Sequence, residues 1–583
     1  ANLERTVVLA AALLGGALLA TSTAFWTYSL VSEVFALNNL LAALITAAML
    51  LWASRVEDPR PLWLAAILSG LAVTNQQTIV LLAPGLLILY GHGLRSAARS
   101  GSVRLDMPSL VRLGLIPAAL FAVGLLPYVY HPLAAAGDPV VNWGDPRTLD
   151  RFWAVVTRES YGTLSLTVRE TRGGVIDQLV LLAAYLWTAF TPAGLALAGI
   201  GLWILGRARP VVAVALAVMF GVSGPLFVAF ANPPLDDPVT RGVLERFYIL
   251  PSLPLALLAG TGAAAAARWA VGRAVRPARQ SAAPAVAAAT VAVAVALVGV
   301  IVAVRYPHVD QSRNRVAETY AHDVLEPLAP DAILLTRSDE NYTSVVFAQV
   351  VRGMRPDVTA LDVELLKLPS YVAQARRQHP SLDIPFGAYD DGARTSLASL
   401  VSANLGRRPV FAIGRFNEDL GARFDEIPWG LTRQIVRTGE APSGSDADRA
   451  AADRFEALHP PTRSWPATTW EGAMAANYGS AAFELALARH KPGALPDATE
   501  IADLYRTAIR LAPQLASAYK NLGLLLLDNG GPRDEIIAAT PLASSSPRTT
   551  SASLCDCVRK TTVSGSINAT RPARRPARTR ARP

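Results

Sequence analysis

The chain has 583 residues, of which 52% are hydrophobic and only 17% are charged. A soluble chain of this length normally carries charge on about a quarter of its residues, so the composition excludes an ordinary soluble protein. The net charge of +9 misleads, because nine basic residues and one acidic residue follow Thr540. The rest of the chain is nearly neutral, so no nucleic-acid partner is expected. Both cysteines, Cys555 and Cys557, lie in this basic tail, which excludes a disulfide framework.

Charge is sparse before Val304 and ordinary after Arg305, which indicates two different environments. A membrane-spanning helix needs about 20 apolar residues. The candidate spans are residues 7–20, 25–52, 113–130, 176–205, 211–230, 247–267 and 284–304. A further apolar stretch, 61–90, is interrupted by the polar residues 74–78, and we expect a hairpin whose polar tip lies inside the protein, because lipid cannot satisfy exposed amides. Residues 1–305 are therefore predicted to form an α-helical polytopic membrane bundle of about seven spans plus this hairpin.

Basic residues in three short connections set the expected orientation. The three groups are Arg95, Arg99, Arg104 and Arg112, then Arg207 and Arg209, and finally Arg268, Arg273, Arg276 and Arg279. Positively charged loops stay in the cytoplasm, so the loop 131–178 and everything after Arg305 are expected outside it. The first apolar stretch is one of many and lacks a cleavage site, so no signal peptide is expected. The sequence begins at Ala1 without a methionine, and we expect that it is a fragment.

Residues 306–440 are predicted to form a small extracytoplasmic α/β domain. Short buried strands are expected at 332–336, 358–363 and 409–413, and helices at 341–351 and 369–378. This alternation predicts a small parallel sheet.

Residues 441–530 are predicted to be helical and tetratricopeptide-like. The residues that match the spacing of a tetratricopeptide helix pair are Tyr505, Ala508, Pro513, Tyr519, Leu522 and Gly523, with an unrelated helical hairpin as the alternative. One repeat cannot bury its own face, so helices near 473–489 are expected to stack on it. Residues 531–583 are expected to be either a disordered basic tail or a frameshifted end.

Two charged residues beside the predicted spans are candidates for chemistry. Glu33 follows an aromatic belt of Phe25, Trp26 and Tyr28, which would place it about two helical turns inside the outer leaflet. Ionisable groups at that depth are costly and usually functional, so Glu33 is either a catalytic carboxylate or a packing group bonded to a neighbouring helix. Arg246, where an outer loop enters a span, either binds the phosphate of a lipid-linked donor or snorkels to the interface.

The outer loop 131–178 carries the remaining candidates. Asp145 followed by Pro146 fits a helix start, although Asp145 is also the second candidate for a catalytic carboxylate. The amphipathic stretch 148–156 after it would lie on the membrane surface as a lid over a cavity. In that interpretation Arg158, Glu159 and Tyr161 face the substrate, and Trp143 belongs to the same substrate-binding group. The hairpin tip Asn75, Gln76 and Gln77 either lines a cavity or, as we favour, caps the two half-helices.

Several familiar sites are missing from the sequence. It contains no Walker loop, HExxH zinc motif, GxSxG elbow or dinucleotide fingerprint, and no metal site is expected. The triplets Asn341-Tyr-Thr343 and Asn568-Ala-Thr570 fit the N-glycosylation pattern, which is common by chance.

Several segments together resemble one family. The matching motifs are Trp26-x6-Glu33-Val34-x-x-Leu37-Asn38, Asn142-Trp-Gly-Asp-Pro146, Glu245-Arg-Phe-Tyr248, Ser338-Asp-Glu-Asn341 and Arg352-Gly-Met-Arg-Pro-Asp-Val358. In order and spacing they resemble a bacterial membrane family, formerly of unknown function, that is related to the eukaryotic transmembrane protein O-mannosyltransferases of glycosyltransferase family 117. The resemblance covers about residues 7–366, and bacterial members often end in tetratricopeptide repeats.

The resemblance implies a GT-C-type enzyme in a bacterial inner membrane. It implies a polyprenyl-phosphate sugar as donor, with mannose as the candidate sugar, and an extracytoplasmic protein or glycan as acceptor. Such an enzyme needs a carboxylate as general base and cationic groups for the lipid phosphate, but no further cofactor. In the family the acidic motif lies in the first outer loop, which we expect to precede Ala1.

Two other functions compete with this one. The first is a non-catalytic, membrane-anchored scaffold of the cell envelope whose repeats bind a protein partner. The second is a transporter, which the lack of charged pairs within the spans and the large one-sided outer domain disfavour.

Overall fold

The computed structural model describes residues 2–99, 101, 106–159, 173–274, 283–390, 397–416, 420, 423–442, 444–490 and 498–543. These residues form two compact units. The first unit contains the described residues of 1–316, 361–406 and 468–470, and the second contains those of 317–360, 407–467 and 471–543.

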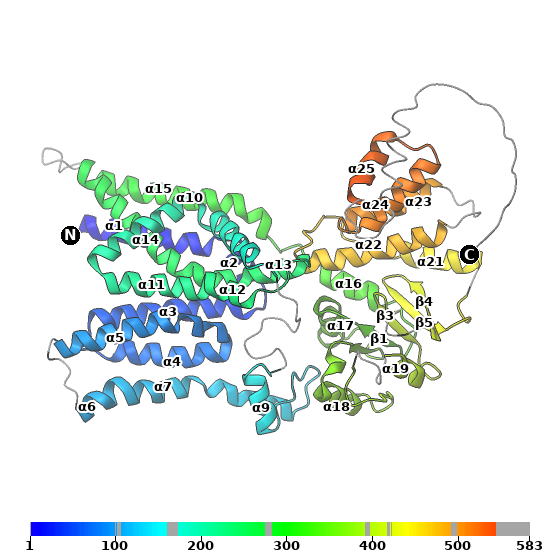
Figure 1. Cartoon of the computed structure of the whole chain (residues 1–583), viewed down its shortest axis with the longest axis horizontal. Coiled ribbons are helices and arrows are strands. Elements are labelled where there is room, and N and C mark those ends of the chain that lie inside the picture. The colour runs from blue at the N-terminus through cyan, green and yellow to red at the C-terminus, as the bar shows by residue number, and fades with distance from the viewer. Residues whose placement is uncertain are drawn as a thin grey trace, which may run out of the picture. The chain divides into compact units, whose positions relative to one another are not determined.

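The first unit consists mainly of long apolar helices (Figure 1). Its first part contains α1 (Asn2–Ala20), α2 (Thr23–Leu30), α3 (Val34–Ser54), α4 (Arg60–Asn75), η1 (Gln77–Leu82), α5 (Ala83–Arg99), α6 (Met107–Leu110), η2 (Val111–Leu115), α7 (Ile116–Gly124), η3 (Leu126–Val129), α8 (Tyr130–Ala136) and α9 (Leu149–Val156). It continues with α10 (Val175–Ala208), α11 (Pro210–Gly221), η5 (Val222–Leu226), α12 (Phe227–Ala231), α13 (Pro238–Glu245), η6 (Arg246–Tyr248), α14 (Ile249–Ala274) and α15 (Ala283–Val309). Later segments add η8 (Leu365–Lys367), α18 (Pro369–Gln378) and α19 (Leu397–Asn404).

Among the described residues, seven helical segments are long and apolar enough to cross a membrane, or eight if the bent pair α1–α2 is one span. This confirms a multi-pass membrane protein. The predicted hairpin is present as α4 followed by η1 and α5, but its second arm runs from Gln77 to Arg99 and is itself long enough to span. Its polar tip is half-buried rather than enclosed.

The predicted span 25–52 is wrong as a single helix. Helix α2 ends at Leu30 and α3 begins at Val34, and the backbone of Val31 and Glu33 is extended. No proline or glycine marks this break, at which Glu33 pairs with Arg246 and Phe35 is buried. Glu33 is therefore the N-cap residue of α3 and does not lie within a membrane helix.

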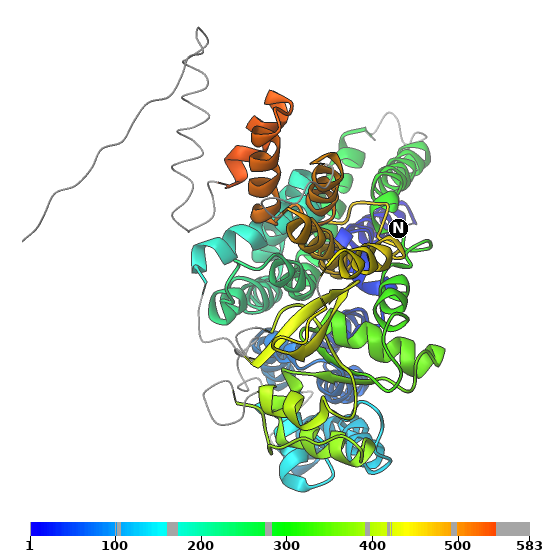
Figure 2. The ribbon, with the colours of Figure 1, turned by 90° about the vertical axis from the view of Figure 1, so that its right-hand side faces the viewer.

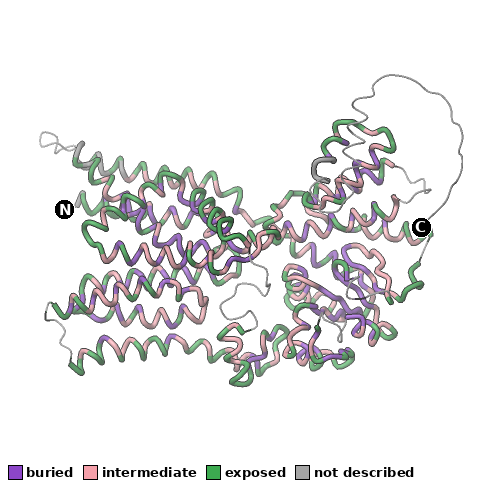
Figure 3. Tube along the Cα trace, in the orientation of Figure 1, coloured by how far each residue is buried: buried purple, intermediate pink, exposed green. Residues whose placement is uncertain are grey.

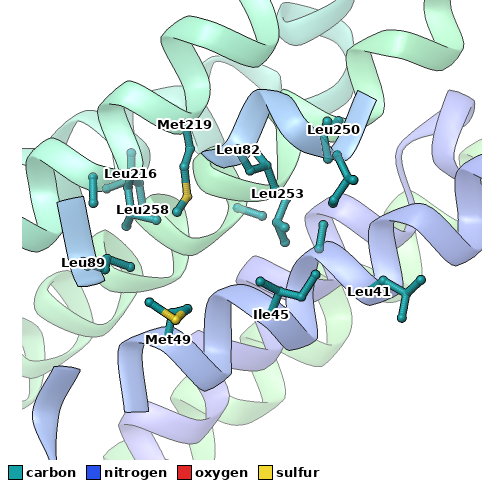
Figure 4. Packing of buried hydrophobic residues seen from close by; sticks show 14 of the residues in the cluster. Leu41, Ile45, Met49, Leu82, Leu89, Leu216, Met219, Leu250, Leu253 and Leu258 are labelled. Carbon is teal, nitrogen blue, oxygen red and sulfur yellow. The ribbon is translucent and has the colours of Figure 1, made fainter. Parts of the chain in front are cut away.

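Side chains from α3, η1, α5, α11 and α14 interlock in the core of this unit (Figure 4). Leu41, Ile45 and Met49 of α3 are almost fully buried there. Elsewhere, glycine allows two helices to touch: a Cβ on Gly201 of α10 would collide with the Leu258 carbonyl, and one on Gly262 of α14 with the Leu197 carbonyl. Close approach at small residues is the usual way in which membrane helices pack, because lipid supplies little hydrophobic drive between them.

Apolar side chains that face outward are frequent on this unit. Helix α15 is exposed along much of its length (Figure 3), and its candidate span is 0% buried. Val293, Leu297, Val300 and Val304 are more than half exposed on it. Such a surface fits lipid and would be a liability in water.

Arg305 on α15 is hydrogen-bonded to two distorted helices. The α1–α2 pair bends by 67° after Ala20, and α10 is kinked at Thr191, which precedes Pro192. The Arg305 guanidinium donates to the carbonyl of Thr21 at 2.6 Å and to that of Thr188 at 2.7 Å. Because a kink leaves carbonyls without their helical donors, this side chain satisfies backbone groups at both breaks.

The second unit contains a mixed five-stranded sheet in the order β2-β1-β3-β5-β4. The strands are β1 (Ile333–Thr336), β2 (Thr359–Asp362), β3 (Val410–Ile413), β4 (Phe424–Trp429) and β5 (Thr432–Arg437). β1 pairs with β3 in parallel, as predicted, but β5 runs antiparallel to both β3 and β4. The prediction of a purely parallel sheet is therefore wrong, because it missed the β4–β5 hairpin, which is yellow in Figure 2.

Helices account for the rest of this unit: α16 (Val316–Leu325), α17 (Asp339–Arg352), α21 (Ser445–Glu456), α22 (Trp470–Arg489), α23 (Ala498–Leu511), α24 (Ala516–Asp528) and α25 (Arg533–Ala543). Tyr505 of α23 and Leu522 of α24 share a core with Ala486 of α22, so the expected stacking is present. Whether this is a tetratricopeptide repeat stays a prediction. The helices also continue past residue 530, since α25 packs Ile536 into the same core.

Candidate functional site

Glu33 and Arg246 are brought together from positions 213 residues apart. A nitrogen of the Arg246 guanidinium donates to Glu33 Oε1 at 3.1 Å. Glu33 reaches this position from the break between α2 and α3, and Arg246 from the first residue of η6. The two side chains are 32% and 23% exposed, so the pair is accessible.

Aromatic rings hold the guanidinium of Arg246 in place. Its Cζ atom lies 5.3 Å from the centre of the Phe35 ring and 5.5 Å from that of Phe247. The two rings meet edge to face at 5.3 Å. The buried Nε of Arg246 makes no hydrogen bond to any described residue. The guanidinium is therefore fixed by ring contacts and one carboxylate, and it keeps unused donor capacity.

The polar hairpin tip, Asn75 to Gln77, forms hydrogen bonds with the start of α3 and with the end of α9. Asn75 Nδ2 donates to the carbonyl of Val34, next to Glu33, at 3.0 Å. Gln77 Nε2 donates to the carbonyl of Val156, the last residue of α9. These bonds go to the backbone carbonyls of other segments and not to the hairpin's own helix ends. The tip therefore connects the Glu33 break to the loop helix.

Helix α9 ends at Val156, as its amphipathic pattern predicts, but it begins at Leu149, one residue later than predicted, and its N-cap differs from the prediction. Thr148, not Asp145, is the N-cap, and its hydroxyl accepts from the backbone N–H of Arg151 at 3.4 Å. Asp145 precedes the helix in a tight turn with φ of 44°. A carboxylate three residues upstream of the cap cannot reach the free N–H groups of the first turn.

Asp145 instead forms the centre of a buried ionic cluster. Its side chain is 3% exposed and pairs with Arg147 at 2.9 Å and with Arg151 at 2.6 Å. Asn142 Nδ2 donates to it at 2.9 Å. Surrounded in this way, the Asp145 carboxylate holds the loop together and has little freedom to accept a proton from a substrate.

Helix α18 clamps the start of the same loop. Arg377 pairs with Asp138 at 2.9 Å, and Gln374 Nε2 donates to the carbonyls of Pro139 and Val140. The hydrogen bond from Arg377, helped by Arg147, holds the pKa of Asp138 below its ordinary value. The loop between α8 and α9 is thus an ordered structure with defined supports.

A cavity of about 400 Å³ lies between this loop and the start of α18. It is lined by Trp143, Gly144, Arg151, Ala154, Val155, Arg158, Leu368, Pro369 and Ser370. Trp143 and Arg158, both predicted as substrate-binding residues, therefore share one cavity. The exposed Glu159 does not line it, and Tyr161 lies outside the described residues.

The predicted residues thus separate into two neighbouring groups. Glu33 and Arg246 form one, and the cavity with Trp143 and Arg158 forms the other; neither Glu33 nor Arg246 lines the cavity. The sequence did not indicate Arg151 or Ser370 as lining residues. The sequence separation of Trp143 and Arg151 does not show that they line one cavity, because the loop turns sharply at Gly144 and Asp145.

Two motifs of the second unit have structural roles. Asn341 is 6% exposed, and its side chain bonds to the Tyr320 hydroxyl at 2.6 Å and to the Arg337 carbonyl. It is therefore not accessible as a glycan acceptor in the folded protein, and Asn568 lies outside the described residues. Arg355 donates to the carbonyls of Leu325, Leu328 and Ala329 just after α16, and its hydrogen bonds keep the pKa of Asp357 at about 2.

These features define a multi-pass membrane protein whose elements α2, α9 and α13 lie toward the same end of the helices (Figure 1). Residues 1–97 match the family model described as the protein O-mannosyl-transferase TMEM260 N-terminal domain. The chain is 28% identical over 387 residues to "Protein O-mannosyl-transferase TMEM260" of Mus musculus, covering 65% of this chain and 53% of that protein. It is 26% identical over 496 residues to the Dictyostelium discoideum protein of the same name, covering 78% and 58%.

The chain thus spans little more than half the length of these relatives. No solved structure matches it.

Proposed function

We propose that the protein is a membrane glycosyltransferase that moves a sugar, with mannose as the candidate, from a polyprenyl-phosphate donor to a hydroxyl of an extracytoplasmic protein or glycan. The observation that carries the proposal is the accessible Glu33–Arg246 pair, in a chain similar to protein O-mannosyl-transferases. We further propose a bacterial inner membrane as its location, with α9 and the second unit on the outer side. The tetratricopeptide-like helices would bind a protein partner.

Arg246 would bind the donor phosphate. A guanidinium offers paired N–H donors that match two phosphate oxygens, and the Arg246 side chain is partly exposed and lies against the Phe35 and Phe247 rings. When the donor phosphate binds Arg246, Glu33 loses its ion pair and becomes able to accept a proton.

The reaction itself is a displacement at the sugar C1 atom. The acceptor oxygen attacks C1 while Glu33 takes its proton, the bond from C1 to the phosphate oxygen breaks, and its electron pair leaves with the polyprenyl phosphate. The positive guanidinium stabilises the negative charge that grows on the leaving phosphate. The loop cavity, with Trp143 and two arginines, would receive the acceptor or the sugar.

Sugar transfer by membranes that contain the protein tests this assignment. With radiolabelled polyprenyl-phosphate mannose and a serine- and threonine-containing acceptor protein, we expect Arg246→Ala to lower the rate by about 100-fold or more. Arg246→Lys should recover only part of it, because an ammonium lacks the paired donor geometry. Glu33→Gln should abolish transfer yet leave donor binding intact.

Arg241→Ala is the matched control, because Arg241 is an exposed residue of the neighbouring helix α13. It should transfer sugar at the unsubstituted rate. Unchanged transfer by Arg246→Ala and Glu33→Gln would remove these two residues from the site. Absence of transfer by the unsubstituted protein, with all common sugars, would favour a non-catalytic scaffold.

A further inference from the structure

Two histidines and one aspartate converge on a single point in the second unit. His322 and Asp323 stand near the end of α16, and His459 follows α21 by three residues. The Nδ1 atoms of His322 and His459 lie 3.4 Å and 2.9 Å from the same oxygen, Asp323 Oδ1. The three ligand atoms all lie within 4.8 Å of one another. We propose that His322, Asp323 and His459 form a binding site for a divalent transition metal, with zinc as the metal expected.

The Asp323 carboxylate is oriented by its surroundings. The backbone N–H of His459 donates to its other oxygen, Oδ2, at 2.6 Å, and the Tyr478 hydroxyl donates to the same oxygen at 2.9 Å. Oδ1 is thereby presented to the two imidazoles. Metal sites are commonly supported in this way, by hydrogen bonds from a second layer that fix the ligands.

Charge balance favours a cation at this point. The Asp323 side chain is only 2% exposed, and its ionic partners among the described residues are the two histidines, with no lysine or arginine. A buried carboxylate without a positive partner is costly. A divalent cation bound to Oδ1 and to two neutral imidazoles would supply the missing charge.

The chemistry of the three ligands selects the class of metal. Two imidazole nitrogens and one carboxylate oxygen suit zinc and its late transition-metal neighbours, whereas calcium and magnesium prefer oxygen ligands alone. Zinc bonds of about 2.0–2.2 Å place tetrahedral ligand atoms about 3.3–3.5 Å apart, so His322 Nδ1 already lies at a suitable distance from Asp323 Oδ1, and His459 Nδ1 must move slightly away from it. The side chains of His322 and His459 are 50% and 67% exposed, so they have room to make this adjustment.

The site differs from a closed structural zinc site in one respect. Three protein ligands leave a coordination position for water or for an exchangeable ligand. A metal here would tie the segment after α21 to the end of α16. The inference stands apart from the proposed sugar transfer and does not depend on it.

Zinc binding to the purified full chain tests the site. The protein is prepared in detergent without a polyhistidine tag, and with Cys555→Ser and Cys557→Ser so that the two thiols of the tail cannot bind the metal. Titration against a fluorescent zinc chelator should show one equivalent of tightly bound zinc. Zinc chloride should also raise the thermal unfolding temperature relative to EDTA, because a ligand that binds only the folded state stabilises it.

Substitutions then assign the ligands. Loss of a hydrogen bond to a ligand costs about 10–100-fold in affinity, so loss of a ligand itself in His459→Ala or His322→Ala should cost at least about 100-fold. His459→Cys should restore most of the binding, because a thiolate is a good zinc ligand. Tyr478→Phe keeps the ring and removes only the hydroxyl, and it should weaken binding by about 10–100-fold.

His308→Ala, at an exposed histidine outside the cluster, is the control and should bind zinc normally. Failure of the protein to bind one equivalent of zinc would overturn the proposal. Unchanged binding by the double variant H322A/H459A would overturn it as well. A protein that binds calcium or magnesium but not zinc would contradict the assigned class of metal.

Discussion

The first unit contains two ionic groups that use similar side chains for different purposes. The Glu33–Arg246 pair has one hydrogen bond, an unused donor on Arg246 and side chains exposed by 32% and 23%. In the second group, the Asp145 carboxylate is 3% exposed and is bonded to Arg147, Arg151 and Asn142. The first group can exchange partners at little cost, whereas the second loses several bonds at once if its carboxylate is removed.

This difference separates a candidate binding site from a structural support. Ion pairs at the surface contribute about 0–1 kcal/mol, and the partly exposed Glu33–Arg246 pair, with its single hydrogen bond, lies closer to this class than Asp145 does and can respond to a charged ligand. Loss of the buried Asp145 carboxylate instead breaks hydrogen bonds to three partners at once, and a hydrogen bond to a charged group contributes about 1.5–3 kcal/mol. The two carboxylates that the sequence indicated as candidates therefore differ in what the fold allows them to do.

The largest expected effect is that of Asp145→Ala on the loop between α8 and α9. Removing the carboxylate leaves Arg147 paired with Asp138 alone and takes this partner from Arg151, and the loss of these hydrogen bonds should destabilise the loop by about 3 kcal/mol. Local cleavage by trypsin follows the population of the open loop when opening is fast. Since about 1.4 kcal/mol is a factor of ten, cleavage near Arg147 and Arg151 should rise by about 100-fold or more.

Glu33→Gln is the matched control in the same assay. Because Glu33 lies outside the loop between α8 and α9 and its partly exposed pair has one hydrogen bond, that loop should be cleaved at the rate of the unsubstituted protein. Equal cleavage of the Asp145→Ala loop and the unsubstituted loop would show that the buried cluster does not support it. The Asp145 cluster and the Glu33–Arg246 pair would then not differ in their contribution to the stability of the loop.

A smaller effect is expected from Thr148→Ala. The Thr148 hydroxyl caps the first turn of α9, and loss of such a cap costs about 1 kcal/mol. Tryptic cleavage of the loop should therefore rise by about fivefold, far less than for Asp145→Ala. Thr157→Ala is the control at the other end of α9, where the hydroxyl bonds only to a carbonyl of its own helix. Similar cleavage of both threonine variants would argue against Thr148 as the cap.

Acidification is expected to have the smallest effect on the loop, and none near neutral pH. The pKa of Asp138 is lowered in the folded loop by Arg377, so its contribution to stability is complete above its ordinary pKa of 3.8. That contribution is lost as pH falls through the lowered value. Tryptophan fluorescence from Trp143 and Trp153 should therefore stay constant from pH 7 to 5 and change only below about 4. In Asp138→Asn this acid transition should be weaker, and an equal transition in both proteins would exclude Asp138 as its source.

Much of the fold could be predicted from apolar length and periodicity. The helix at 369–378 was predicted with the bounds of α18, and the strands at 332–336, 358–363 and 409–413 correspond to β1, β2 and β3. Apolar runs and amphipathic faces carry this information locally. The β4–β5 hairpin was missed because Phe424–Trp429 contains Asp425, Glu426 and Pro428, which are untypical of a strand, although Gly430 with φ of 64° marks its turn.

The site could be predicted only in part, because it is assembled by contacts between distant segments. The sequence indicated Glu33 and Arg246 separately, but not their pairing, which depends on an unmarked break before Val34. It also indicated Asp145 as a helix cap, although its true partners are arginines. The cluster at His322, Asp323 and His459 was unpredictable for the same reason, since 136 residues separate its two parts.

The bonds of Arg305 have a mechanical consequence. One guanidinium donates to Thr21 at the α1–α2 bend and to Thr188 and Ala189 beside the α10 kink. Straightening either helix would pull a carbonyl away from the guanidinium and weaken its hold on the other helix. The shared Arg305 guanidinium therefore couples the α1–α2 bend to the α10 kink. The α1–α2 bend lies just before the break that positions Glu33. The hydrogen bonds of Arg305 on α15 therefore also help to position the proposed catalytic carboxylate.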